Sequence, residues 1–243
     1  MGEKLKNPPL VEALCEFRFA EDSAWDWVLP GQLYEIIRAD FPKRAQIQGF
    51  GMQVQALPKA KPVASVHPAP ERVQFIRSDD SAMVQVGFNL LAINQLRPYS
   101  SWTEFSALIM QIYEEYCSIA GETSFNRIGL RYINHLVATE NIADTLTVTP
   151  PLAGQLTRPL RSFFQRYDLQ YDEPDGILVH QTGTLQNEEN QPVFVLDIDF
   201  GSTSVQDLST PELVRHWLDQ AHDRVYEAFA ASLSESLYLS LKG

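Results

Sequence analysis

Two aspartates separated by one residue give this sequence its clearest hint of chemistry. Asp197 and Asp199 lie in PVFVLDIDF, an apolar run typical of a β-strand. Alternate residues of a strand point to one side, so the two carboxylates would lie about 6–7 Å apart and could hold a divalent cation. The sequence contains no GxxxxGK[ST] loop and no HxH, HExxH or CxxC spacing. The metal hypothesis therefore rests on these two residues.

A second set of charged residues alternates with apolar ones near the N-terminus. In LVEALCEFRF, the side chains of Glu12, Glu16 and Arg18 would share one face of a strand. Arg131, in NRIGLRYINHL, would lie on the same face if the two strands are neighbours. One interpretation is a lattice of cross-strand ion pairs facing water or a partner, which would lower the pKa values of the carboxylates. The other is an anion site in which Arg18 and Arg131 bind a ligand through paired N–H donors.

Composition excludes several classes of protein. The chain has 243 residues and a net charge of −12, which opposes general binding to nucleic-acid phosphates. Arg158, Arg161 and Arg166 form the one obvious basic cluster, and we interpret them as solvated charges. No apolar stretch reaches the ~18 residues of a membrane span, and no apolar segment follows the N-terminal lysines as in a signal peptide. Cys15 and Cys117 lie on apolar faces, so we expect both thiols to be reduced and buried in a cytoplasmic protein.

Residues 10–136 have the spacing of six elements. Alternation predicts strands at 10–20, 72–78, 82–94 and 126–136, and apolar stripes predict helices at 30–41 and 102–120. Ser101 and Glu104 have the spacing of a helix capping box. Because residues 43–71 contain four prolines, we expect a surface loop there, with IQGFGMQVQAL as an alternative edge strand. The order of elements is that of the ferredoxin-like βαββαβ fold.

The second half repeats a plan of sheet and helix. After a loop over 137–161, alternation predicts three strands, in FFQRYDLQY, GILVHQTGTLQ and PVFVLDIDF, joined as an antiparallel meander. Ser209 and Glu212 have capping-box spacing at the start of a long amphipathic helix. The predicted fold is therefore α+β. Its two halves, 1–136 and 137–243, are expected to pack as one compact unit.

Five short motifs occur in order along the chain. They are PPLVEALCEFRF (Pro8 to Phe19), YSSW (Tyr99 to Trp102), LRYIN (Leu130 to Asn134), LDID (Leu196 to Asp199) and AHDRVYEAF (Ala221 to Phe229). With these motifs the chain resembles a sporadically distributed prokaryotic family that has no assigned activity. The resemblance implies an accessory or defence-associated role. Within its motifs, Asn134 and His222 join the candidate binding residues.

We therefore predict a cytoplasmic binding or regulatory module that engages a protein partner, without catalytic residues or a cofactor. Nucleic acid and membrane are not expected partners, and the oligomeric state is left open. The alternative is a metal-dependent enzyme that acts on nucleotides or nucleic acid, with a divalent cation held by Asp197 and Asp199. The candidate ligand- or partner-binding residues are Glu12, Glu16, Arg18, Arg131, Asn134 and His222.

Overall fold

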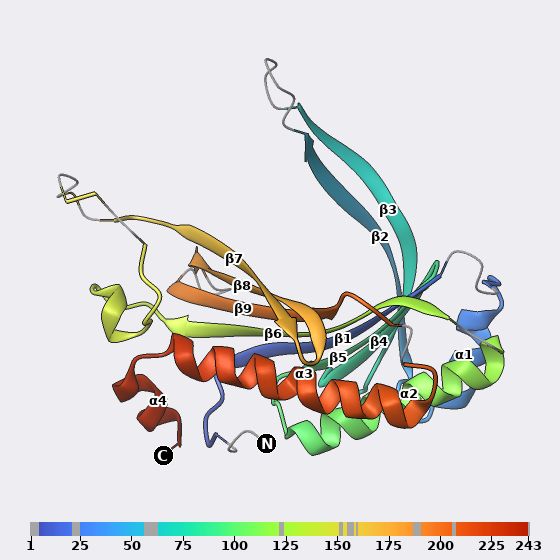
Figure 1. Cartoon of the computed structure of the whole chain (residues 1–243). Helices are drawn as coiled ribbons and strands as arrows, with labels where there is room; N and C mark the ends of the chain where they lie inside the picture. Colours follow the sequence, from blue (N-terminus) through green and yellow to red (C-terminus); the bar gives the residue numbers. More distant parts are fainter. Residues whose placement is uncertain are drawn as a thin grey trace.

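In the computed structural model, one antiparallel sheet forms the centre of the molecule, and helices lie against one of its faces (Figure 1). The structure describes residues 5–20, 25–55, 63–121, 124–150, 153–154, 158, 160–186, 191–205 and 208–242. Within these ranges the sheet has nine strands, in the order β2-β3-β4-β5-β1-β6-β9-β8-β7. The strands are β1 (Leu10–Phe19), β2 (Lys43–Gln55), β3 (Val63–Ile76), β4 (Ala82–Gly87), β5 (Leu90–Leu96), β6 (Phe125–Val137), β7 (Phe164–Asp172), β8 (Asp175–Gln186) and β9 (Pro192–Ser202).

Four α-helices are present in the described residues. They are α1 (Leu29–Ile37), α2 (Trp102–Ala120), α3 (Pro211–Ser232) and α4 (Glu235–Lys242), with a 3₁₀ turn over Ile142–Asp144. Helices α2 and α3 run beneath the middle of the sheet, and α3 contacts β6, β8 and β9 (Figure 1). No helix of the described ranges lies on the opposite face of these central strands. That face lies between the rising β2–β3 hairpin and the curled edge at β7 (Figure 1).

The predicted α+β class, the antiparallel sheet and the C-terminal helix are confirmed. Strands β1 and β6 pair directly, with Cys15 opposite Leu130. The sheet does not stop at the predicted boundary between the halves, because β6 pairs with β9 from Gly129 to Val137. A separate four-stranded sheet followed by a separate meander is therefore not what the described strands form.

The expectation of a surface loop over residues 43–71 is wrong, since β2 and β3 form a long hairpin there. The alternative of an edge strand in IQGFGMQVQAL is confirmed for its described residues, because β2 is at the edge of the sheet. Strand β3 pairs with β4 over Arg72–Ile76 alone, so its earlier part has β2 as its one neighbour in the sheet. A proline can lie in such a strand because its missing N–H can face the unpaired side. The single strand predicted at 82–94 is also wrong. It is divided into β4 and β5 by a turn in which Asn89 has a φ of 52°.

Helix starts follow local capping chemistry. The Ser101 hydroxyl accepts a hydrogen bond from the Glu104 amide at 3.2 Å, as predicted for α2. Helix α3 begins one residue later than predicted, because Thr210 rather than Ser209 is its N-cap and accepts from the Leu213 amide. Among the described helices, none has both the length and the apolar composition needed to cross a membrane.

The two cysteines are not linked to each other. Cys15 is fully buried among core side chains beneath the sheet, and burial raises the pKa of its thiol well above the usual value. Cys117 on α2 is partly exposed, so the prediction that both thiols are buried is wrong for this residue. The cause is the helical spacing, which places Cys117 at the edge of the buried stripe beside Tyr113 and Tyr116.

Candidate functional site

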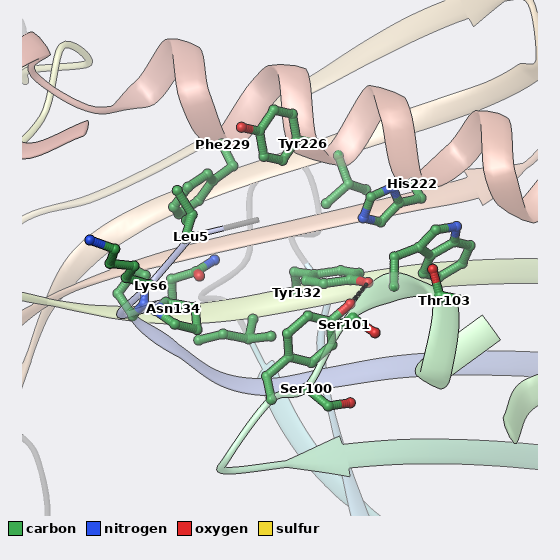
Figure 2. Close-up of a pocket in the computed structure, with 16 residues that line it drawn as sticks. Leu5, Lys6, Ser100, Ser101, Thr103, Tyr132, Asn134, His222, Tyr226 and Phe229 are labelled. Carbon is green, nitrogen blue, oxygen red and sulfur yellow. Dashed lines mark hydrogen bonds between the residues drawn. The ribbon is translucent and has the colours of Figure 1, made fainter. Parts of the chain in front are cut away.

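A cavity of about 530 Å³ lies between the sheet and α3, close to the start of α2 (Figure 2). Its walls come from four segments that are far apart in the sequence: the chain before β1, the loop before α2, β6 and α3. Four of the five motifs quoted above supply lining residues. The lining residues are Leu5, Lys6, Pro8, Pro9, Leu10, Tyr99, Ser100, Ser101, Trp102, Thr103, Tyr132, Asn134, His222, Val225, Tyr226 and Phe229.

Aromatic rings make up much of the cavity wall. The Trp102 indole stacks on the His222 imidazole, with ring centroids 4.4 Å apart and planes within 12°. Tyr132 meets the edge of the same imidazole at 5.9 Å, and Tyr99 meets Tyr132 at 5.8 Å. The Trp102 Nε1–H donates to Asp219 Oδ1 at 2.8 Å, which ties the start of α2 to α3. The cavity is therefore held open by rings whose positions are fixed by contacts with one another.

Local structure explains how these side chains reach one place. Tyr132 and Asn134 are two residues apart on β6, so both point toward the helices. His222 lies one helical turn before Val225 and Tyr226 on α3, and Figure 2 shows its ring turned toward Tyr132 below it. The intervening residue, Ile133, points to the other face of the sheet.

The polar groups that face the cavity include the Asn134 amide, two tyrosine hydroxyls and the His222 imidazole. Asn134 is 3% exposed, and its Nδ2 donates to the Leu196 carbonyl at 3.2 Å. Figure 2 shows its amide directed into the cavity. The Tyr99 and Tyr132 hydroxyls lie 3.0 Å apart, so one O–H donates to the other and the second O–H remains available. The imidazole of His222 makes no hydrogen bond to any described residue, and its nearest carboxylate is Asp223, 3.9 Å from Nδ1.

Burial keeps the ionisable groups of the wall uncharged at neutral pH. Desolvation lowers the pKa of His222 to about 4, against smaller opposing effects of Asp223 and Asp219. Burial also raises the pKa of Tyr99 to about 12 and raises the pKa of Tyr132 well above its usual value. Among the described lining residues, Lys6 alone carries a charge, and its side chain is exposed. The interior is therefore neutral in a protein of net charge −12.

The uncovered face of the sheet carries a lattice of ion pairs. Arg127 lies between two acids, with its Nη1 3.4 Å from Glu16 and its Nη2 2.9 Å from Asp199. Arg18 binds Glu16 from the other side, at 2.7 and 3.0 Å. Arg131 binds both oxygens of Asp197 at 2.8 and 2.6 Å. These arginine–carboxylate contacts form a chain from Arg18 to Asp199 and a separate Arg131–Asp197 pair, which together span β1, β6 and β9.

The remaining candidate on this face is Glu12, which accepts a hydrogen bond from Asn94 on β5 at 2.5 Å. Lowered carboxylate pKa values were expected across the lattice, but the pKa of Asp199 is raised. Burial is the main cause, and it outweighs the attraction of Arg127 and Arg131. The lattice is thus partly dehydrated rather than fully wet.

The two carboxylates of the metal hypothesis are each held by an arginine. Asp197 faces Arg131 and Asp199 faces Arg127, so a cation would have to displace or approach a guanidinium. No group of three or more potential metal ligands occurs within the described residues. Of the predicted basic cluster, Arg166 forms an exposed pair with Asp168, at 2.8 Å.

The structure divides the predicted residues between two places. Asn134 and His222 lie in the cavity, whereas Glu12, Glu16, Arg18 and Arg131 lie on the opposite face with Asp197 and Asp199. Sequence reasoning did not name Arg127 as a site residue. Its spacing of four from Arg131 on one strand indicates that the two share a face, and this signal could have found it.

Comparison with known proteins adds no function. No protein-family profile matches the chain, and no curated protein is significantly similar to it. The function must therefore be inferred from the two sites themselves.

Proposed function

We propose that the protein is a non-catalytic, cytoplasmic binding and regulatory module, and that the cavity beside α3 is its ligand site. The observation that carries this proposal is the convergence of four distant segments on a neutral, aromatic cavity of about 530 Å³. Small-molecule sites have volumes of roughly 300–1,000 Å³, apolar walls and a few polar groups, and this cavity has all three properties.

The shared strand β6 supports a regulatory role. Its residues Tyr132 and Asn134 line the cavity, while Arg127 and Arg131 on the same strand join the ion-pair lattice of the other face. A ligand that contacts Tyr132 therefore also affects the position of β6, the strand that carries Arg127 and Arg131 of the lattice. The uncovered face, with charged side chains of both signs, suits a protein partner.

A variant that plugs the cavity tests the proposal. Thr103 lines the cavity from an exposed position near the start of α2, so Thr103→Trp places a large ring at its mouth without disturbing the core. Gln111→Trp, at an exposed position further along α2 that is not part of the lining, is the matched control. A fragment screen by thermal shift should find aromatic ligands that stabilise the wild type and the control but not Thr103→Trp.

The outcome that refutes ligand binding is equally clear. Ligands that stabilise the wild type, Thr103→Trp and Gln111→Trp to the same extent bind elsewhere. A screen in which no fragment stabilises the wild type would contradict ligand binding in the cavity. Native pull-downs with wild type and Arg131→Met test the proposed protein partner separately. The substitution alters the uncovered sheet face and leaves the residues that line the cavity unchanged.

We also propose that β4, β5, β1 and β6, with α1 and α2, form a ferredoxin-like unit to which the β2–β3 hairpin and a β7–β9 meander are added. The support is the neighbour order β4-β5-β1-β6 and the antiparallel pairing of each step. Native-state hydrogen exchange should then open these four strands together, and separate opening of β4 and β5 from β1 and β6 would contradict the assignment.

A further inference from the structure

Asn134 is the most deeply buried of the polar residues in the described cavity lining. A carboxamide has two N–H donors and one carbonyl acceptor. One N–H is used on the Leu196 carbonyl, and no described residue donates to Oδ1. Asn134, a residue that is 3% exposed, therefore has one donor and one acceptor left to offer. A polar group that faces a cavity of this size can bind water until a ligand replaces that water.

The absence of charge among the described residues of the cavity interior limits which ligands can bind to Asn134. The described lining residues include no cation except Lys6, which is exposed on the chain before β1. Figure 2 shows Lys6 at one side of the cavity, with its amino group directed away from His222 and Tyr132. A carboxylate moved into the interior would lose its hydration without gaining a counter-charge. An uncharged ligand does not have this large cost in hydration free energy.

Shape limits the ligand as well. The stacked rings of Trp102 and His222 and the ring of Tyr132, which meets His222 at a steep angle, all line the space. Aromatic walls contact a planar ring through stacked or edge-to-face geometry over its whole area. His222 and the free Tyr99–Tyr132 hydroxyl proton can serve a second polar atom of the ligand.

We propose that the cavity binds a planar, uncharged molecule whose edge carries an amide-type donor and acceptor, and that Asn134 recognises this edge with two hydrogen bonds. The inference rests on the proposed function, because it names the ligand class of the same cavity. Asn134 acts as the specificity-determining residue, while the aromatic walls supply contact area that does not discriminate between polar groups.

Three probes of nearly equal shape test the inference. Benzamide carries the amide edge, benzoate replaces it by an anion, and toluene removes its polarity. Ligand-observed NMR titrations of the full chain should give benzamide about tenfold tighter binding than either of the others, because benzoate and toluene leave polar groups of Asn134 without a matching partner. In Asn134→Leu, which keeps a side chain of similar size, benzamide should fall to the affinity of toluene, with toluene binding retained.

The results separate two kinds of failure. Binding of none of the probes would refute the ligand site itself. Binding of benzoate as tightly as benzamide, or an undiminished benzamide preference in Asn134→Leu, would overturn the amide inference and leave the ligand site standing. If Asn134→Leu does not fold, N,N-dimethylbenzamide decides the question in the wild type. It lacks the N–H donors and should bind about tenfold more weakly than benzamide, and equal binding would overturn the inference.

Discussion

Acidification should destabilise this protein through His222. The imidazole is 9% exposed, and burial lowers its pKa from 6.5 to about 4. At a pH between these two pKa values, His222 is protonated in the unfolded chain and neutral in the folded chain. The free energy of unfolding therefore falls as pH decreases through this window. From these two pKa values the loss is about 2 kcal/mol at pH 5 and about 3 kcal/mol by pH 4.

Replacing the imidazole by a ring that cannot titrate isolates this effect. His222→Phe keeps a flat ring that can stack on Trp102, so the core contact survives while the proton site is lost. The assay is urea denaturation followed by far-UV circular dichroism at several pH values from 7.5 to 5. The difference in unfolding free energy between wild type and variant should change by about 2 kcal/mol across this range, in favour of the variant at low pH.

A matched variant on the same helix controls for any general effect of a histidine-to-phenylalanine substitution on the free energy of unfolding. His216 is exposed on α3, so His216→Phe should follow the wild-type pH profile. Parallel profiles for wild type and His222→Phe would show that His222 is protonated as readily in the folded protein as in the unfolded chain. That result would refute the description of a dehydrated, neutral cavity wall.

Three further outcomes are expected. Arg131→Met should lower the free energy of unfolding by about 1–3 kcal/mol, because it leaves the 10%-exposed Asp197 side chain without its bidentate partner, whereas Arg38→Met, in an exposed pair, should cost under about 0.5 kcal/mol in the same urea melts. A polar alkylating reagent should modify Cys117 well before Cys15 in the native protein, and equal rates by mass spectrometry would contradict the burial of Cys15. Mg²⁺ or Mn²⁺ should leave the melting temperature unchanged, and a rise that disappears in Asp197→Asn would instead favour the metal-dependent enzyme.

Local periodicity predicted part of this structure correctly. Alternation in the first strand assigned Glu12, Glu16 and Arg18 to one face, and the same rule placed Arg131 opposite the core. Capping chemistry located Ser101 at the start of α2. These features depend on neighbours within a few residues, which the sequence displays directly.

Features that depend on distant neighbours were not predictable in the same way. Tyr99, Tyr132 and His222 lie in different elements, and no local pattern shows that their rings meet around a cavity. The raised pKa of Asp199 likewise follows from burial, which only the assembled sheet creates. Prolines misled the prediction for residues 43–71, because their effect depends on whether a strand is paired on one side or on both.

The most direct test of the central claim uses the indole in the cavity wall. In protein labelled with 5-fluorotryptophan, the ¹⁹F signal of Trp102 can be assigned with Trp102→Phe, and Trp27, 72% exposed and outside the lining, provides an internal reference. Titration with benzamide should move the Trp102 signal in a saturable manner and leave the Trp27 signal in place. A Trp102 signal that stays fixed at saturating benzamide, or moves together with that of Trp27, would contradict a ligand site in this cavity.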